Sequence, residues 1–572
     1  MPQDAVTLRR QASDLNELFY GAKVNKITQP TKDEIVLYLY SPKKSAKLLI
    51  CSNALFSRVG ITEIDKKNPV TAPSFCMLLR KHLLNASIKN ISAIKDERII
   101  KIVFDGKNDF MESVEKQLYC EVMGKYSNAI FCENEIILGT LKTSSLELNK
   151  DRVLLSGAKY SLPKSQEKTS IFNKESFLSI IKSFNGGNLD DFIFNNVTGF
   201  ALSTAKEAVR RFYGKTSFDG EIKKSEEFYN SVINFLDDTS TLPTCCAING
   251  KITDYFFCDY QTVFGEKTFF ERISEAETFF FDQKQLTREF NDAQNKLISI
   301  VNAKLKKERK KLEIIENKII ACDGAEQKRR CGELITANIY KIKRGDKYVL
   351  VEDYYNDNAS LKIALDEELS PNANAQKYFK AYTKLKNTLK AVQPQKEQTL
   401  TECDYLESVL SELNVCTTQS DLLEIKEELM QSGIIESDKK ALTKNKKNSD
   451  TSLYREYEFK GFTIRAGKNN IQNDKLTFSS KASDTWLHAK DYHSAHVVIE
   501  TNGKPTPDDI ILIAAEICAF YSEAKNGTKV PIDYTLKKYV KKPPKAKYGS
   551  VIYTDFKTIF VTPDSHFNLA KK

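Results

Sequence analysis

Residues 279–320 read FFFDQKQLTREFNDAQNKLISIVNAKLKKERKKLEIIENKII, a stretch in which apolar residues recur at spacings of mostly three or four. Lysine and glutamate fill most of the positions between them, an arrangement typical of the apolar seam of a coiled-coil helix. The seam consists of Leu286, Phe290, Ala293, Leu297, Val301, Leu305, Leu312, Ile315 and Ile319. The stretch therefore predicts a long helix in the middle of the chain.

A second run with the same spacing lies further along the chain. It consists of Tyr378, Tyr382, Leu385, Leu389, Val392, Leu400, Cys403, Leu406, Leu410 and Leu413. Two long helices with matching seams predict an antiparallel hairpin, so we expect a coiled-coil middle domain over residues 279–436. The piece between the runs, near residues 334–372, alternates like short strands and ends in turn residues, which predicts a small tip domain.

The N-terminal part of the chain has a periodicity of two. Short runs such as EIVLYLY and RIIKIVF, rich in isoleucine, valine, tyrosine and phenylalanine, alternate with turn residues. These runs indicate strands, so we expect a β-rich domain over residues 1–170. Two helical exceptions are predicted within it, at Thr7–Phe19 and Phe75–Leu84.

Residues 171–278 switch to short helices. The segment VTGFALSTAKEA (197–208) has the layout of a helix-hairpin-helix motif. In that motif a glycine-containing turn lets backbone N–H groups and a helix N-terminus approach a nucleic-acid phosphate. The usual second glycine is Ala201 here, so a plain helical hairpin is an equally good interpretation.

Beyond the middle domain, lysine-rich residues 437–452 predict a flexible linker. Residues 453–572 predict an α/β domain with a helix through Ile510–Ser522. This domain contains GKNNIQNDKLTF (467–478), which crowds amides and cations between two alternating runs. Asparagine and glutamine offer donors and acceptors to RNA edges and lysine attracts phosphate, whereas the plainer alternative is that the asparagines build turns. The single tryptophan, Trp486, suits stacking on a base, yet its alternating surroundings favour a core strand.

The composition bounds the class of protein. A chain of 572 residues is too long for one hydrophobic core and should form about three to five units. Lysine plus arginine exceed aspartate plus glutamate by 86 to 76, giving a net charge of +10. Lysines concentrate from Lys525 onward, which favours a phosphate polymer as partner, although a solvated lysine-rich face gives the same pattern.

Several classes are disfavoured by the sequence. The 12 cysteines are scattered without a C-x-x-C pair, and no apolar run has the roughly 18 residues that a membrane span requires. We therefore expect reduced thiols, no membrane contact and a cytoplasmic protein. His488, His493 and His496 lack a neighbouring cysteine or acidic cluster, so we interpret them as strand and loop residues and expect no metal site.

Longer motifs carry a family resemblance. FCMLLRKHL (75–83), EVMGKYSNAIF (121–131), CGELITAN (331–338), LSPNANAQKYFKAYTKLK (369–386) and DTWLHAK (484–490), together with GKNNIQNDKLT, resemble the NFACT family and its bacterial RqcH branch. The resemblance covers nearly the whole chain in order. It implies an α+β multidomain protein: a β-rich N-terminal domain with a helix-hairpin-helix, a long antiparallel coiled-coil arm with a small tip domain, and an α/β C-terminal RNA-binding domain.

The resemblance also implies a function in ribosome-associated quality control. Proteins of this family bind the large ribosomal subunit, through rRNA and stalk-base protein, when a stalled nascent chain remains as peptidyl-tRNA. They recruit alanyl-tRNA, so that the ribosome adds a C-terminal alanine tail without mRNA and the chain is marked for proteolysis. Because the ribosome makes the peptide bonds, the resemblance implies neither a catalytic residue nor a metal or cofactor.

The resemblance assigns candidate binding residues as well. The family's tRNA-handling acidic and Asp-Arg positions match Asp4, Glu97 and Arg98, with Glu97 in place of the usual aspartate. Arginine presents a planar fork to phosphates and base edges, and a carboxylate can orient it; alone, the pair is more simply a surface ion pair. We add Arg80 and Lys81 to this tRNA-binding group. The RNA-binding candidates of the C-terminal domain are Lys468, Asn469, Asn470, Gln472, Asn473 and Lys475.

Two other functions fit single features of the sequence. A fibronectin-binding adhesin at the cell surface is the main alternative, but the sequence shows no export signal and its cysteines are unpaired by pattern. A DNA glycosylase that uses Pro2 as an imino nucleophile is a third hypothesis. Such enzymes pair this proline with an acidic neighbour and a cysteine zinc finger, whereas Gln3 follows here.

Overall fold

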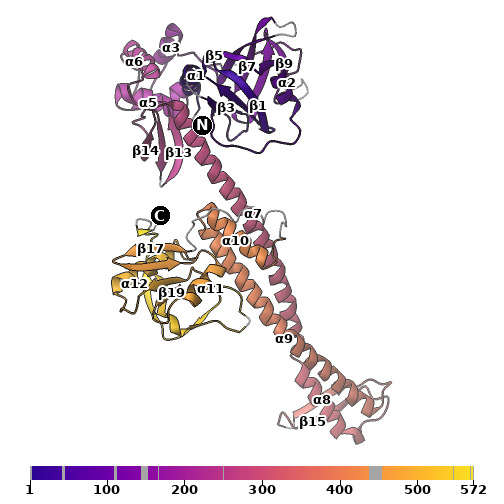
Figure 1. Ribbon diagram of the computed structural model, residues 1–572. Helices are drawn as coiled ribbons and strands as arrows, with labels where there is room; N and C mark the ends of the chain where they lie inside the picture. The colour runs from indigo at the N-terminus through magenta and orange to yellow at the C-terminus, as the bar shows by residue number, and fades with distance from the viewer. Residues whose placement is uncertain are drawn as a thin grey trace. The chain divides into compact units, whose positions relative to one another are not determined.

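The computed structural model describes residues 3–41, 45–107, 112–143, 152–164, 167–248, 250–357, 359–436, 454–544, 546–566 and 569–570. The chain divides into two compact units, Met1–Arg288 and Glu289–Lys572. Both units mix helices and sheets (Figure 1), so the predicted α+β class is confirmed. Among the helices of these ranges, none combines the length and apolar composition that a membrane span requires. The predicted linker at 437–452 and Pro2 lie outside the described residues.

The first unit contains a nine-stranded antiparallel sheet with the order β4-β3-β2-β1-β5-β6-β7-β8-β9. Its strands are β1 Lys23–Thr31, β2 Glu34–Tyr40, β3 Ser45–Cys51, β4 Arg58–Ile61, β5 Ser87–Ala93, β6 Ile99–Lys107, β7 Ser113–Glu121, β8 Asn128–Glu133 and β9 Ile136–Thr140. Apolar strand residues such as Leu37, Ile102 and Phe131 form a core with α1 (Ala5–Phe19) and α2 (Ser74–Leu83). The two helices predicted in this domain are confirmed, with boundaries shifted by one or two residues.

Short helices and a second sheet complete the first unit. They are α3 Lys174–Lys182, α4 Leu189–Asn196, α5 Leu202–Tyr213, α6 Ser225–Asp237, the paired β10 Gly187–Asn188 and β11 Ser217–Phe218, and a sheet of β12 Thr244–Ile248, β13 Lys251–Phe256 and β14 Glu266–Phe269. A turn joins α4 to α5, so the hairpin predicted at 197–208 is present. The helix α7 (Ile273–Ile320) begins here, and its residues Ala276 and Phe280 are buried in the core of this region.

In the second unit α7 lies antiparallel to α9 (Pro371–Val415). Gln294 Nε2 donates to Leu413 O at 2.6 Å, and Lys396 Nζ lies 2.9 Å from Glu316 Oε1, so residue numbers rise along one helix as they fall along the other. The order of these contacts confirms the predicted antiparallel pair.

The apolar seam between these helices is shorter than predicted. Leu297, Val301, Leu305, Leu406 and Leu413 are buried in one cluster. The third helix α10 (Gln419–Gln431) extends this cluster with Leu422, Ile425 and Leu429. The seam prediction is wrong at Leu286, Leu389 and Leu400, which are exposed.

The tip between α7 and α9 contains two strands in the piece where the alternation predicted them, preceded by a helix that it did not predict. It is built from α8 Ala325–Ala337, the 3₁₀ turn Ile339–Lys341, β15 Tyr348–Asp353 and β16 Ala359–Ala364. Cys331, Leu334 and Ile335 have helical spacing and are buried in the tip core. Gly332 brings α8 close to α9, because a Cβ there would lie 3.0 Å from the ring of Phe379. This packing holds the helix α8 against α9.

The C-terminal domain is a six-stranded antiparallel sheet with the order β17-β18-β20-β19-β21-β24. Its elements are β17 Arg455–Phe459, β18 Phe462–Ala466, α11 Asn470–Ser479, β19 Thr485–Ala489, β20 Val497–Glu500, α12 Asp508–Phe520, β21 Val530–Leu536, β22 Val540–Lys541, β23 Ile552–Tyr553 and β24 Lys557–Val561. Leu487 and Val497 face α12, whereas Trp486 and Val498 pack with Leu476 of α11. Trp486 is fully buried, which confirms the predicted core strand.

Candidate functional site

A cavity of about 490 Å³ in the first unit brings together three of the predicted tRNA-binding residues. Asp4, Glu97 and Arg98 all line it, next to the turn between α4 and α5. The rest of the lining includes Lys164 and Lys168. Carboxylates and cations that are far apart in the sequence therefore meet in one hollow.

Glu97 and Arg98 lie on the tight loop that joins β5 to β6. The loop turns sharply at Asp96, whose φ is 64°, and the Glu97 N–H donates to Ile94 O at 3.1 Å. The Val122 N–H donates to Arg98 O at 2.8 Å and fixes the end of the loop. Burial raises the pKa of the Glu97 carboxyl, although the neighbouring Arg98 opposes the shift. Glu97 therefore holds its proton to a higher pH than a solvated glutamate does.

Asp4 joins two helix N-termini. One carboxylate oxygen accepts from Thr7 N at 2.8 Å and caps α1. The other accepts from Ala201 N at 2.9 Å and from Thr204 Oγ at 2.6 Å at the start of α5. A helix N-terminus is where a phosphate would bind, so the phosphate contact considered for the hairpin turn is replaced here by the chain's own carboxylate.

Gly199 serves the same junction. Its φ is 85°, and a Cβ there would lie 3.3 Å from the Cβ of Ala5. The Ala5 N–H donates to Gly199 O at 3.1 Å. The glycine of the hairpin motif therefore allows close packing of α1 against the turn.

Arg80 and Lys81 are not brought to this cavity. Both lie on α2, where Arg80 Nε donates to Ile27 O at 2.8 Å and Lys81 is exposed. The sequence reasoning missed Lys168 and Phe194, which line the cavity; Lys168 Nζ donates to Phe194 O at 2.9 Å and lies 5.1 Å from its ring centre. No local pattern marks them, because they come from a loop and from α4.

The amide cluster of the C-terminal domain forms the start of α11. Asn469 caps this helix by accepting from Gln472 N at 2.9 Å. Asn469, Asn470, Gln472 and Asn473 are all buried, whereas Lys475 is exposed. The asparagines therefore begin a helix, where the plainer alternative from the sequence placed turns.

The buried amides bind other parts of the second unit. Asn470 Nδ2 donates to Ser408 Oγ at 2.9 Å and lies 3.3 Å from Glu428 Oε1. Gln472 Nε2 donates to Glu424 Oε2 at 2.7 Å. The structure thus gives these side chains internal partners on α9 and α10, where the sequence predicted RNA.

Lys468 is likewise directed inward. Its Nζ lies 3.7 Å from both Asp421 and Glu424, and its side chain is largely buried. Asn473 Oδ1 accepts from His496 N at 3.0 Å and ties α11 to the sheet. Among the six predicted RNA-binding residues, Lys475 is the one with an exposed side chain.

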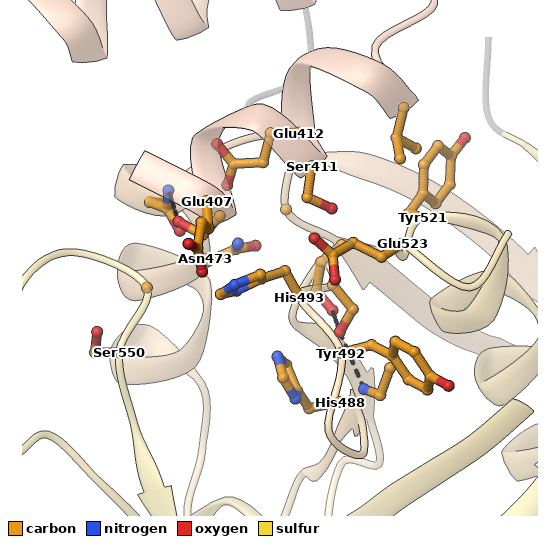
Figure 2. A pocket seen from close by; sticks show the side chains of 18 of the residues that line it. Glu407, Ser411, Glu412, Asn473, His488, Tyr492, His493, Tyr521, Glu523 and Ser550 are labelled. Carbon is orange, nitrogen blue, oxygen red and sulfur yellow. Dashed lines mark hydrogen bonds between the residues drawn. The ribbon is translucent and has the colours of Figure 1, made fainter. Parts of the chain in front are cut away.

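A second cavity, of about 720 Å³, lies between α9 and the C-terminal domain. Figure 2 shows Glu407, Ser411 and Glu412 of α9 around it, with His488 and His493 from the domain. Burial lowers the pKa of His488 to about 4, so this ring is neutral at neutral pH. Within the part of the chain that the structure describes, no cluster of three or more histidine, cysteine, aspartate or glutamate side chains is placed to hold a metal ion.

Burial also changes the pKa of two carboxyl groups where α9 and α10 contact the C-terminal domain. Burial raises the pKa of Glu412, and the charge of Glu428 raises it further, whereas Arg455 opposes the shift. Burial also raises the pKa of Glu428, although hydrogen bonds from Tyr405 and Asn470 oppose this. Burial at this contact therefore shifts the pKa of both carboxyls upward.

Exposed cations and aromatic rings alternate on another part of the C-terminal domain. We call this group the lysine strip; it consists of the exposed Lys475, Lys538, Lys541 and Lys542 and the half-buried Lys537. Lys542 Nζ also pairs with Asp474. Lys537 Nζ lies 5.8 Å from the ring centre of Phe478, and Lys542 Nζ lies 5.1 Å from that of Tyr548. Cations beside exposed rings can bind phosphates and stack on bases together.

Comparisons with known proteins agree with this architecture. Residues 4–449 match a family model described as NFACT N-terminal and middle domains, and residues 453–555 match one described as NFACT protein RNA binding domain. The chain is 33% identical over 560 residues to a Bacillus subtilis protein named "Rqc2 homolog RqcH", covering 96% of each chain. It is 31% identical over 574 residues to a Streptococcus pneumoniae protein of the same name, covering 99% of this chain and 98% of the relative.

A solved structure is also similar. It is the N-terminal part of the fibronectin/fibrinogen-binding protein from Streptococcus suis, which shares 24% identity with a TM-score of 0.42. The match covers 49% of this chain and 98% of that one. A TM-score this low carries no argument about function.

Proposed function

We propose a function from the premise that the chain belongs to the NFACT family: it is an RNA-binding factor of ribosome-associated quality control. In the proposal it binds large ribosomal subunits that carry peptidyl-tRNA on a stalled nascent chain. It recruits alanyl-tRNA, and the ribosome extends the chain with alanine and so marks it for proteolysis. Since this work is done on ribosomes, the proposal includes a cytoplasmic site of action.

The cavity of the first unit is the observation that carries the tRNA part of the proposal. It gathers Glu97 and Arg98 with two lysines and Phe194 in about 490 Å³. An arginine fork and a carboxyl group can read base edges, a ring can stack on a base, and lysines attract the phosphates beside it. Arg80 and Lys81 remain predicted phosphate contacts on α2, away from this cavity.

The lysine strip supports the RNA-binding part. Its exposed lysines and rings provide sequence-independent attraction to rRNA, which positions the protein without selecting a base. We assign no catalytic residue to the chain, because in this proposal the ribosome forms the peptide bonds. The chain's task is to hold RNA in place.

The test is to purify the tagged protein from cells and sequence the RNA that it retains. We expect large-subunit rRNA and a narrow set of tRNAs, without small-subunit rRNA. The double variant Glu97→Ala, Arg98→Ala should lose tRNA and keep the subunit. The matched control is Lys89→Ala, Glu115→Ala, which removes an exposed ion pair of the same unit and should keep both. Retention of neither rRNA nor tRNA by the wild type would refute the proposal.

A further inference from the structure

The contact between the C-terminal domain and the helices α9 and α10 is mainly polar. Among the described residues of α9 and α10, only Val415 belongs to the hydrophobic cluster of the C-terminal sheet. The apolar cluster of α7, α9 and α10 includes no described residue of the C-terminal domain. Domains that are joined by polar contacts separate more readily than those that share an apolar core.

Acidic residues on the helices supply these polar contacts. We call them the acidic face; it consists of Glu402 of α9 and Asp421, Glu424 and Glu428 of α10. The three α10 residues are spaced three and four apart, so they lie on one side of the helix over roughly 10 Å. A row of carboxyl oxygens with this spacing resembles the acceptor oxygens of a short piece of phosphate backbone.

The acidic face holds cations and amides of the C-terminal domain. Arg455 Nη2 lies 2.8 Å from Asp421 Oδ2, and both side chains are largely buried. Lys547 Nζ lies 2.9 Å from Glu402 Oε2. With Lys468, Asn470 and Gln472, described above, these are the side-chain types that bind phosphates and base edges in RNA complexes. Three of the six predicted RNA-binding residues thus contact the acidic face.

Two buried carboxyl oxygens at this contact also lack a hydrogen-bond partner among the described residues. Glu412 Oε2 and Glu428 Oε2 are buried and accept no hydrogen bond from any described residue. The cavity of about 720 Å³ lies at the same place (Figure 2), so side chains of the two parts do not fill the space between them. Buried carboxylate oxygens without donors and unfilled space both disfavour the closed contact. The closed arrangement is therefore weaker than its ion pairs suggest.

We propose that the acidic face acts as an internal mimic of RNA: it occupies cations and amides of the C-terminal domain, and a single-stranded RNA competes for them and releases the domain from α9 and α10. This inference rests on the proposed function, in which the domain binds RNA. The lysine strip would make the first contact, since it is exposed while the acidic face is in place. Arg455, Lys468 and Lys547 would then join the RNA.

The test measures binding of a labelled 20-nucleotide poly(U) to the full chain and to the variant Glu402→Gln, Glu424→Gln. Both substitutions keep a hydrogen-bonding side chain of the same size and remove one charge each. If the acidic face competes with RNA, affinity should rise about three- to tenfold, as expected for the loss of two partly exposed ion pairs. The matched control Glu326→Gln, Glu367→Gln changes the net charge equally at exposed tip positions and should change affinity less than twofold.

A second measurement follows the release itself. Hydrogen exchange of the wild type should become faster in α10 when poly(U) is added, and slower around the lysine strip. Unchanged affinity of the variant, or unchanged exchange of α10 in a wild type that binds poly(U), would overturn the inference and leave the proposed RNA binding intact. If neither protein bound poly(U), the RNA-binding function and the inference would both be refuted.

Discussion

Asp4→Ala should loosen both helices that this carboxylate caps. The substitution removes the hydrogen bonds from Thr7 N, Ala201 N and Thr204 Oγ in a buried position. The loss of one N-cap costs about 1 kcal/mol, and a buried donor left without a partner costs about 1–3 kcal/mol. Because the three bonds share one side chain, their contributions do not add fully, and we expect a loss of about 3 kcal/mol.

Hydrogen exchange measured by mass spectrometry gives the local readout. A loss of about 3 kcal/mol corresponds to a roughly 100-fold faster exchange in the first turns of α1 and α5. Asp4→Asn keeps one capping oxygen, so its effect should be closer to tenfold. Peptides from α12, in the other unit, should exchange at an unchanged rate.

The control for Asp4 is Asp65→Ala. Asp65 is an exposed carboxylate of the same unit that pairs with Lys47 at 2.7 Å, and such surface pairs contribute little. If Asp4→Ala accelerated exchange in α1 and α5 no more than Asp65→Ala does, the capping argument would be wrong. If tRNA retention fell in step with the faster exchange across the Asp4 variants, the contribution of Asp4 to tRNA binding would be structural.

Three further predictions concern other parts of the chain. Burial raises the pKa of Glu277 from 4.5 to about 8, so the folded state binds an extra proton between these values. Its stability should therefore fall as pH rises through this range, by up to about 5 kcal/mol. Glu277→Gln should abolish this fall in calorimetric melting between pH 5.5 and 8.5, and a parallel fall in both proteins would contradict it. Gly332→Ala should destabilise the tip by about 1–3 kcal/mol, because its methyl group would press on the ring of Phe379 at 3.0 Å; an unchanged rate of hydrogen exchange in α8 would argue against this. Lys475→Ala with Lys541→Ala should weaken binding to poly(U) and flatten its dependence on salt by about two units of slope, whereas an unchanged slope would remove the lysine strip from the interface.

Local spacing predicted much of the fold. The helices at Thr7–Phe19 and Phe75–Leu84 were predicted within two residues. Apolar residues on the buried side of a helix recur every three to four positions, and this spacing does not depend on which residues they pack against. The antiparallel pair of α7 and α9 was predictable for the same reason. The helix α8 was not predicted, since its buried apolar residues Cys331, Leu334 and Ile335 occupy little more than one turn.

The candidate sites were harder to predict than the fold. The types of side chain were informative: Glu97 and Arg98 do line one cavity with Asp4. Their partners were not predictable, because Lys168 and Phe194 arrive from separate segments with no pattern of their own. The burial of Asn470 and Gln472 depends in the same way on Glu428 and Glu424, which lie far away in the sequence.

At two places where the sequence suggested a contact with nucleic acid, the structure shows a contact within the chain. At the start of α5 and at the start of α11 the sequence shows the groups that bind an anion, namely free N–H groups, amides and lysines. In both places a carboxylate of the same chain takes the anion's position: Asp4 at α5, and Glu424 and Glu428 at α11. Such motifs predict that an anion is bound, but the chemistry of the motif does not distinguish a phosphate from a carboxylate that the fold already brings within reach. RNA contacts are therefore best sought first at cations for which the described residues show no ion pair, such as Lys475 and Lys541 in the lysine strip. Cations such as Lys547 come next, because its carboxylate partner is only partly buried and can be displaced.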